Sequence, residues 1–161
     1  MTVRDYNQAV DDYSDSIYRF ILKNMRDEER SRDIVQDTFE KLWIKKGDVN
    51  ASKVRSYLFS TAYHTMIDII RKENRQTSFS EAPEMSYSHE DQYSDLQEIL
   101  HKALEKLPES QRAVIMLRDY EGYSYDEISE ITGLSESQVK VYIYRGRLFL
   151  KKYIGNPARV L

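Results

Sequence analysis

Apolar residues recur at helical spacing in both halves of the chain. In the first half, the pattern predicts amphipathic helices over about residues 3–25, 28–45 and 53–73. In the second half, apolar positions repeat over residues 96–107, and Pro108 favours the start of a further helix. No stretch alternates between apolar and polar residues for long enough to indicate a strand. The chain is therefore predicted to be all-α.

A polar segment separates the two halves. Residues 74–94 read NRQTSFSEAPEMSYSHEDQYS and show no helical periodicity, and residues 73–95 hold one basic and six acidic side chains. A structureless run of about 20 residues is uncommon inside a compact domain. We therefore predict two small helical domains, residues 1–73 and 95–161, joined by a flexible linker over residues 74–94.

The second half carries a helix-turn-helix pattern. Two capping boxes, Ser124-x-x-Glu127 and Ser135-x-x-Gln138, open two helices, and Gly133 between them supplies a left-handed turn residue. Apolar residues that can share one core follow the spacing of both helices: Ile128, Ile131, Leu134, Val139, Ile143, Gly146 and Leu150. The C-terminal domain is therefore predicted to be a helix-turn-helix domain.

The second of these helices forms a basic edge on an acidic domain. Residues 135–152 carry five basic and one acidic side chain, whereas residues 96–134 carry four basic and eight acidic ones. At 100° per residue, the side chains that lie away from the core stripe are Ser137, Lys140, Val141, Tyr144 and Arg145, with Arg147, Lys151 and Lys152 beside them. This face predicts contact with duplex DNA. The alternative is an ordinary solvated face of a C-terminal helix.

Basic and aromatic side chains also gather on the polar face of the predicted helix over residues 53–73. They are Lys53, Tyr57, Ser60, His64 and Arg71, with Tyr63, Lys72 and Arg75 alongside. Aromatic rings that stack on bases, together with cations that meet phosphates, suit the binding of unpaired nucleic acid. An amphipathic helix with tyrosines on its outer face is the alternative.

The composition limits the remaining function classes. The chain has 161 residues, with 24 Lys and Arg against 27 Asp and Glu, so its overall charge of −3 does not indicate a nucleic-acid-binding protein. The lack of cysteine excludes disulfides, thiolate metal sites and cysteine nucleophiles. No run reaches the roughly 18 apolar residues of a membrane span, and the first residues lack an apolar signal core. We expect a cytoplasmic protein without direct membrane insertion.

Two residue pairs suggest an enzymatic alternative. Asp33 with Asp37 and His64 with Asp68 are each spaced i, i+4, so each pair can share one helix face as metal ligands or as an acid–base couple. The chain has only three His, no glycine-rich phosphate loop and no nucleophile motif. We therefore predict that it is not an enzyme, with no catalytic residue, metal, cofactor or small-molecule substrate.

Three segments resemble the extracytoplasmic-function (ECF) sigma factors, the small two-domain specificity subunits of bacterial RNA polymerase. ALEKLPESQRAVIMLRDYEGYSYDEISEITGLSESQVKVYIYRGRLFLKK at residues 103–152 resembles their helix-turn-helix domain. DIVQDTFEKLW at residues 33–43 resembles the helix that grips the clamp of the largest polymerase subunit, and residues 57–72 resemble the promoter-melting helix. The resemblance implies a factor that binds core polymerase and directs promoter-specific transcription initiation.

The resemblance also implies roles for three sets of residues. Core polymerase contact is implied for Asp33, Gln36, Asp37, Phe39, Glu40, Leu42 and Trp43. Contact with the minus-10 element, which the N-terminal domain would melt, is implied for Lys53, Tyr57, Tyr63, His64, Asp68, Arg71, Lys72 and Arg75. Reading of the minus-35 element is implied for Ser137, Lys140, Val141, Tyr144, Arg145 and Arg147. The loop around residues 46–53 would hold an extruded base, and at His64 the chain departs from the Asn of many relatives.

The implied partners are the clamp and flap region of core RNA polymerase, promoter DNA and an anti-sigma factor. A free-standing helix-turn-helix transcriptional regulator is the main alternative, because such a protein would bind duplex DNA without replacing a polymerase subunit. It accounts for the second half of the chain only and leaves the segment over residues 33–43 unexplained. Binding to core polymerase separates the two interpretations.

Overall fold

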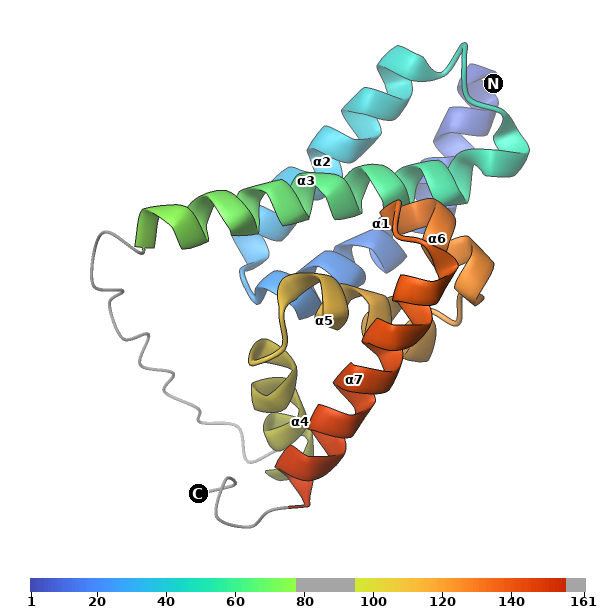
Figure 1. The fold of residues 1–161 in the computed structure, drawn as a ribbon. Helices are drawn as coiled ribbons and strands as arrows, with labels where there is room; N and C mark the ends of the chain where they lie inside the picture. Colours follow the sequence, from blue (N-terminus) through green and yellow to red (C-terminus); the bar gives the residue numbers. More distant parts are fainter. Residues whose placement is uncertain (78–94, 156–161) are drawn as a thin grey trace.

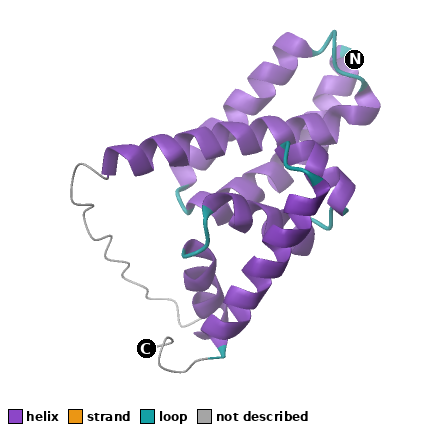
Figure 2. Cartoon of the chain, viewed as in Figure 1, coloured by secondary structure: helices purple, strands orange, loops and turns teal. Residues whose placement is uncertain are grey.

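The computed structural model describes residues 1–77 and 95–155, and these residues form helices connected by short turns (Figure 1). The helices are α1 (Val3–Met25), α2 (Glu28–Lys45), α3 (Val54–Thr77), α4 (Asp95–Glu105), α5 (Glu109–Ile115), α6 (Tyr125–Thr132) and α7 (Glu136–Ile154), with a 3₁₀ turn η1 (Ala51–Lys53) and a π turn η2 (Met116–Tyr120). The described part of the chain contains no strand (Figure 2). The all-α prediction is confirmed.

Caps fix the start of α1 and the sharp turn between α1 and α2. The Thr2 hydroxyl accepts a hydrogen bond from the Asp5 backbone N–H at 3.0 Å, and the Asp5 carboxylate accepts one from the Thr2 N–H at 3.0 Å. α1 ends where Arg26 adopts a left-handed conformation with φ of 57°, and the Asp27 side chain then caps α2. The chain therefore reverses within two residues, which lets α2 pack against α1.

The first three helices enclose an apolar core. Its fully buried side chains include Ile17, Phe20, Ile21, Leu42, Leu58, Ala62 and Met66. α3 continues to Thr77, so residues 74–77, which the sequence placed in the linker, extend this helix. The rest of the predicted linker, residues 78–94, lies outside the described residues.

The helix-turn-helix prediction is confirmed by its local geometry. Both capping boxes are formed, with the Ser124 and Ser135 hydroxyls accepting from the backbone three residues later. Gly133 has φ of 78°, and the Ser129 hydroxyl donates to the Leu134 carbonyl at 2.6 Å, which holds the turn between α6 and α7. Ile128, Ile131, Val139, Ile143 and Gly146 are buried, as the helical spacing predicts.

The two halves pack on each other through α3. This long helix crosses the molecule, with α5 and α6 lying against it and α7 running away from it (Figure 1). The Phe59 ring lies between Phe20 of its own half, at 5.7 Å, and Tyr123 of the other, at 5.3 Å. The buried residues of both halves thus form one continuous core, although the sequence suggested only a tether between them.

Candidate polymerase and nucleic-acid surfaces

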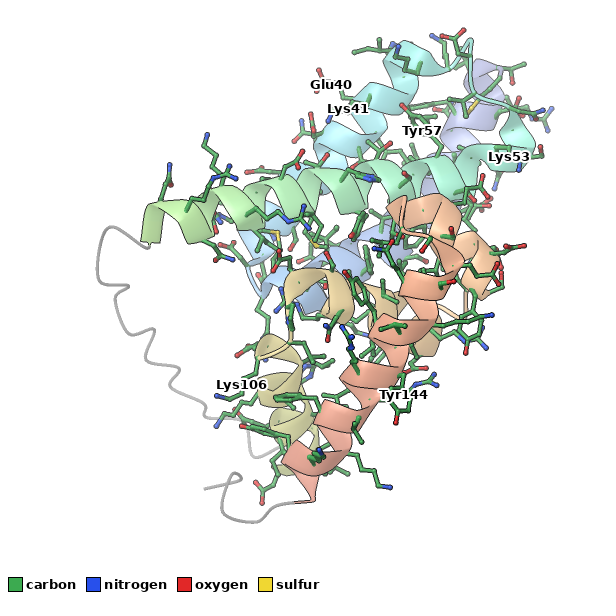
Figure 3. All side chains as sticks on the ribbon, in the orientation of Figure 1. Glu40, Lys41, Lys53, Tyr57, Lys106 and Tyr144 are labelled. Carbon is green, nitrogen blue, oxygen red and sulfur yellow. The ribbon has the colours of Figure 1, made fainter. Side chains whose placement is uncertain are left out.

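α7 presents the predicted minus-35 face to solvent. Ser137, Lys140, Val141, Tyr144, Arg145 and Arg147 are all exposed. Tyr144 is 70% exposed and projects away from the body of the protein (Figure 3). Val139 and Ile143 lie on the opposite side of α7 and are buried, so they anchor the helix to the core. This arrangement offers cations, an aromatic ring and a small apolar side chain to a duplex groove.

Arg147 differs from the other cations of this face. Its guanidinium forms an ion pair with Asp119 of η2, and the hydrogen bond to Asp119 raises the pKa of Arg147. Beside it, a hollow of about 340 Å³ is lined by Tyr125, Lys140, Ile143, Tyr144, Arg147, Leu148 and Lys151. The pairing fixes Arg147 at the edge of the α7 face, whereas Arg145 projects into solvent.

α2 presents an acidic and polar face. Asp33, Gln36 and Glu40 are exposed, and the half-buried Asp37 pairs with Lys41 at 3.1 Å (Figure 3). A hollow of about 320 Å³ beside this face is lined by Arg30, Asp33, Ile34, Asp37, Thr65 and Ile69. The face thus combines carboxylates with a shallow apolar floor.

Not every residue predicted for the polymerase surface lies on it. Phe39 and Leu42 are buried in the core, so they position α2 and do not face a partner. Trp43 is 43% exposed, with its ring meeting Tyr6 edge-on at 5.0 Å. Ile44, which the sequence analysis did not select, is 70% exposed next to it. In the sequence, Ile44 can be recognised as an apolar residue that lies outside the core stripe of its helix.

A cavity opens at the start of α3, next to the loop that precedes it. It has about 390 Å³ and is lined by Asp48, Val49, Asn50, Lys53, Ser56, Tyr57, Ser60 and Glu130. Lys53 and Tyr57 both belong to the predicted minus-10 set (Figure 3). The resemblance implies an extruded base in the loop around residues 46–53, and the cavity adjoins that loop. Glu130 of α6 also lines the cavity, although it lies far beyond the loop along the sequence.

Further along α3, some of the predicted minus-10 residues are exposed, and others contact the C-terminal half. His64, Asp68, Lys72 and Arg75 are exposed. His64 Nδ1 lies 2.8 Å from the Ser60 carbonyl oxygen, so this nitrogen carries the proton and donates.

Tyr63 and Arg71 are engaged by the C-terminal half, contrary to the expectation of a free face. Tyr63 is only 3% exposed, and its burial raises the pKa of its hydroxyl. Arg71 donates from Nε to Glu109 at 3.1 Å and from Nη2 to Ser110 at 3.2 Å. The physical reason is the packing of α5 against α3, which spacing along a single helix cannot reveal.

Residues 1–77 and 95–155 contain neither a cluster of metal ligands nor a helix that could span a membrane. Within these ranges, no three His, Asp or Glu side chains are grouped to hold a metal ion, and the Asp33/Asp37 and His64/Asp68 pairs gain no third ligand. None of the helices in these ranges combines the length and the apolar character of a membrane span.

Comparison with known proteins matches both halves to one family. Residues 9–76 match the model of sigma-70 region 2, and residues 97–150 match that of sigma-70 region 4. SigV of Bacillus subtilis is 31% identical over 140 residues, covering 85% of this chain and 83% of its own. SigM of the same organism, an ECF sigma factor, is 28% identical over 159 residues and 94% of both chains.

A solved structure agrees with the sequence relatives. The sigma factor RpoE of Bartonella quintana, determined in complex with the anti-sigma factor NepR, superposes with a TM-score of 0.79 at 27% identity, over 96% of this chain and 99% of that one. The chain therefore belongs to the sigma-70 family. Within that family it is an ECF sigma factor, because SigM, an ECF sigma factor, matches it over 94% of both chains and regions 2 and 4 account for most of its residues.

Proposed function

We propose that this chain binds core RNA polymerase and directs promoter-specific initiation, reading the minus-35 element with α7 and melting the minus-10 element with the N-terminal half. The observation that carries the proposal is the presence of regions 2 and 4 in one chain. A free-standing helix-turn-helix regulator accounts for region 4 alone and leaves the α2 and α3 surfaces without a role.

The chemistry of α7 suits direct reading of base edges. Arg145 and Lys140 can donate to the acceptors of guanine in the major groove, and Val141 can contact the thymine methyl group. Ser137 lies near the start of the helix, where a recognition helix meets the bases. Tyr144 is proposed to enter the groove beside these residues, and Arg147 at the edge of the face is proposed to meet a backbone phosphate.

The start of α3 suits capture of an unpaired base. The hollow beside Lys53 and Tyr57 has about 390 Å³, which is within the usual range of ligand pockets. A ring such as Tyr57 gives a stacked base about 1–3 kcal/mol. His64 Nδ1 donates to the Ser60 carbonyl, so Nε2 is the ring nitrogen that is proposed to meet a base edge. Asp68, Lys72 and Arg75 continue the face along the helix.

The acidic face of α2 is the proposed contact for the polymerase clamp. Asp33, Gln36, Asp37 and Glu40 supply the polar contacts, and exposed Trp43 supplies an apolar one. Region 4 is proposed to meet the flap region. The Bartonella relative was solved with an anti-sigma factor, so we also propose such a partner for this chain. The protein would act in the cytoplasm, where polymerase is, without catalysing a reaction of its own.

Binding to sigma-free core polymerase tests the proposal. Asp37→Lys reverses a charge on the α2 face and should weaken the complex at least about tenfold, since truncated interfacial charge pairs typically cost that much. Asp11→Lys makes the same charge change at an exposed position of α1 outside the predicted surface and should leave affinity unchanged. No binding by the unchanged chain, or equal loss in both variants, would contradict the proposal.

A further inference from the structure

The C-terminal half covers part of the proposed minus-10 face. Ser110 of α5 and Tyr142 of α7 lie close to Tyr63, whose side chain is almost fully buried. Phe59, one turn earlier on α3, meets Tyr123 edge-on at 5.3 Å, and both rings are buried. An unpaired DNA strand therefore has no access to Tyr63 while the halves are packed together.

Two cations of this face, Arg71 and Lys53, pair with carboxylates of the C-terminal half. Arg71 Nε lies 3.1 Å from the Glu109 carboxylate, and Lys53 Nζ lies 3.8 Å from that of Glu130. Glu130 also lines the cavity in which we place the extruded base. Carboxylate and phosphate oxygens compete for the same charged donors. The two glutamates thus stand where a DNA backbone would need to bind.

The same complementarity continues on α1 and at the residue that follows it. Arg19 pairs with Glu121 at 3.1 Å, and Arg26 pairs with Glu105 at 3.0 Å. In each of these four pairs, the cation belongs to the N-terminal half and the carboxylate to the C-terminal half. Exposed ion pairs are individually weak. All four pairs nevertheless put the positive charge on the N-terminal half. Together they favour packing against this part of the C-terminal half, because residues 96–134 hold eight acidic against four basic side chains.

The minus-35 face lies outside this interface. Lys140, Tyr144 and Arg145 remain exposed on α7 while α5 and α6 cover α3. Tyr144 projects away from α3 in Figure 3. Packing of the halves therefore covers part of the proposed minus-10 surface on α3 and leaves the proposed minus-35 surface on α7 exposed.

We infer that the C-terminal half is an internal competitor of the promoter strand, with Glu109 and Glu130 holding Arg71 and Lys53 in place of phosphates. The inference rests on the proposed assignment of α3 to the minus-10 element. The packed chain leaves α7 free for duplex DNA but binds unpaired DNA weakly until α5 and α6 leave α3. Strand binding and separation of the halves are coupled, because DNA that binds only the separated form shifts the equilibrium toward it.

Binding of single-stranded DNA is the first test. The probe is fluorescein-labelled oligo(dT) of about 15 nucleotides, since stacking surfaces tolerate any base. The variant Glu109→Gln/Glu130→Gln should bind it about 2- to 30-fold more tightly than the control Asp95→Asn/Asp126→Asn, the range that two exposed pairs can shift an equilibrium. The control makes the same charge change at exposed positions of the same half. Adding Lys53→Gln and Arg71→Gln to the Glu109→Gln/Glu130→Gln variant should abolish the increase in its affinity for oligo(dT).

A distance measurement is the second test. The chain has no cysteine, so spin labels on Asp11→Cys and Lys152→Cys, both at exposed positions, report the separation of the halves directly. The otherwise unchanged chain should give one narrow distance distribution. The Glu109→Gln/Glu130→Gln change should add a broader, longer component, and oligo(dT) should increase it. Circular dichroism confirms that each variant keeps its helices.

The two tests separate failure of this inference from failure of the proposed function. A broad distribution in the otherwise unchanged chain overturns the packed form, whatever polymerase binding shows. The Glu109→Gln/Glu130→Gln variant can show separated halves and still bind oligo(dT) no more tightly than its control. That result overturns the inference that the two glutamates compete with the strand, and it also contradicts the assignment of α3 as the strand-binding face. Tighter binding by Glu109→Gln/Glu130→Gln with the halves still packed also overturns it, because the gain would then come from lost repulsion alone.

Discussion

Gly146 of α7 is the glycine at which an added methyl group meets the most severe overlap. It lies between Arg145 and Arg147 of the proposed minus-35 face, but it is buried against α5. A Cβ atom at this position would lie 2.0 Å from Ile115 Cδ1 and 3.2 Å from Ile115 Cγ1. Carbon atoms in contact are normally about 3.5–4.0 Å apart. Ile115 is itself only 2% exposed, so its side chain has little room to move aside.

The expected loss of stability for Gly146→Ala follows from two opposing effects. Overpacking of a core costs about 1–3 kcal/mol, and an overlap this severe belongs near the upper end. Replacing a helical glycine by alanine returns about 1 kcal/mol of helix propensity. The net loss of unfolding free energy is therefore about 2 kcal/mol. For a chain of this size, each kcal/mol lowers Tm by about 2–4 °C, so Tm should fall by about 4–8 °C.

Thermal unfolding followed by circular dichroism measures this loss, with Gly47→Ala as the control. No atom lies within 4 Å of a Cβ added at Gly47, so its Tm should change little. Ile115→Val removes the Cδ1 atom that clashes, at a cost of about 0.5–1.5 kcal/mol alone. The double variant should therefore be no less stable than Gly146→Ala. A Tm for Gly146→Ala equal to or above that of the unchanged chain would refute the reasoning.

Three further predictions concern the α7 cap, the α7 face and the packing of the halves. Ser135→Ala removes the α7 cap and should lower the unfolding free energy by about 1 kcal/mol. The control Ser137→Ala removes no cap and should lower it far less. Equal Tm values for the two variants would contradict this prediction. Arg145→Ala should weaken binding to a minus-35 duplex by about 1–3 kcal/mol in gel-shift titrations without changing Tm, and unchanged affinity would count against α7 as the reading helix. Burial first, and then the charge of Arg26, lower the pKa of His101 in the packed form from its usual 6.5. The packed form thus binds fewer protons, so lowering the pH from about 7.5 to 5.5 should favour separated halves in the spin-label measurement. His101→Gln should remove that pH response, and a packed fraction that rises at low pH would refute it.

Local features of the fold can be predicted from the sequence. The caps at Ser124 and Ser135 and the turn at Gly133 depend on residues within four positions along the chain. The exposed face of α7 follows from helical geometry once Val139 and Ile143 are assigned to the core. The bounds of α7 and the exposure of its predicted face can therefore be derived from the sequence, whereas contact of that face with DNA stays a prediction.

The packing of the two halves depends on residues far apart in the sequence. Phe59, Tyr63 and Ile67 recur at four-residue spacing and form a second buried stripe on α3, which indicates a helix covered on two sides. That pattern does not identify what covers it. Arg71 meets Glu109 across 38 positions of sequence, and only the tertiary structure brings them together. The burial of Tyr63 by the C-terminal half likewise depends on contacts that the spacing of residues along α3 does not reveal.

Burial also decides which residues of α2 can meet a partner. Phe39 and Leu42 share the helical spacing of the polymerase segment, yet both point into the core, while Trp43 and Ile44 are exposed. The resemblance identifies the helix but does not separate its inner from its outer side. The solvent exposure of each side chain makes that distinction.

Reconstituted run-off transcription tests the central claim most directly. Purified chain and sigma-free core polymerase are combined on a pool of genomic promoter fragments, with each protein alone as a control. The account predicts transcripts with defined start sites only when both are present, and their loss with Asp37→Lys or Arg145→Ala. If no defined starts appear with both proteins, while the chain alone protects duplex DNA, the assignment as a polymerase specificity subunit is wrong.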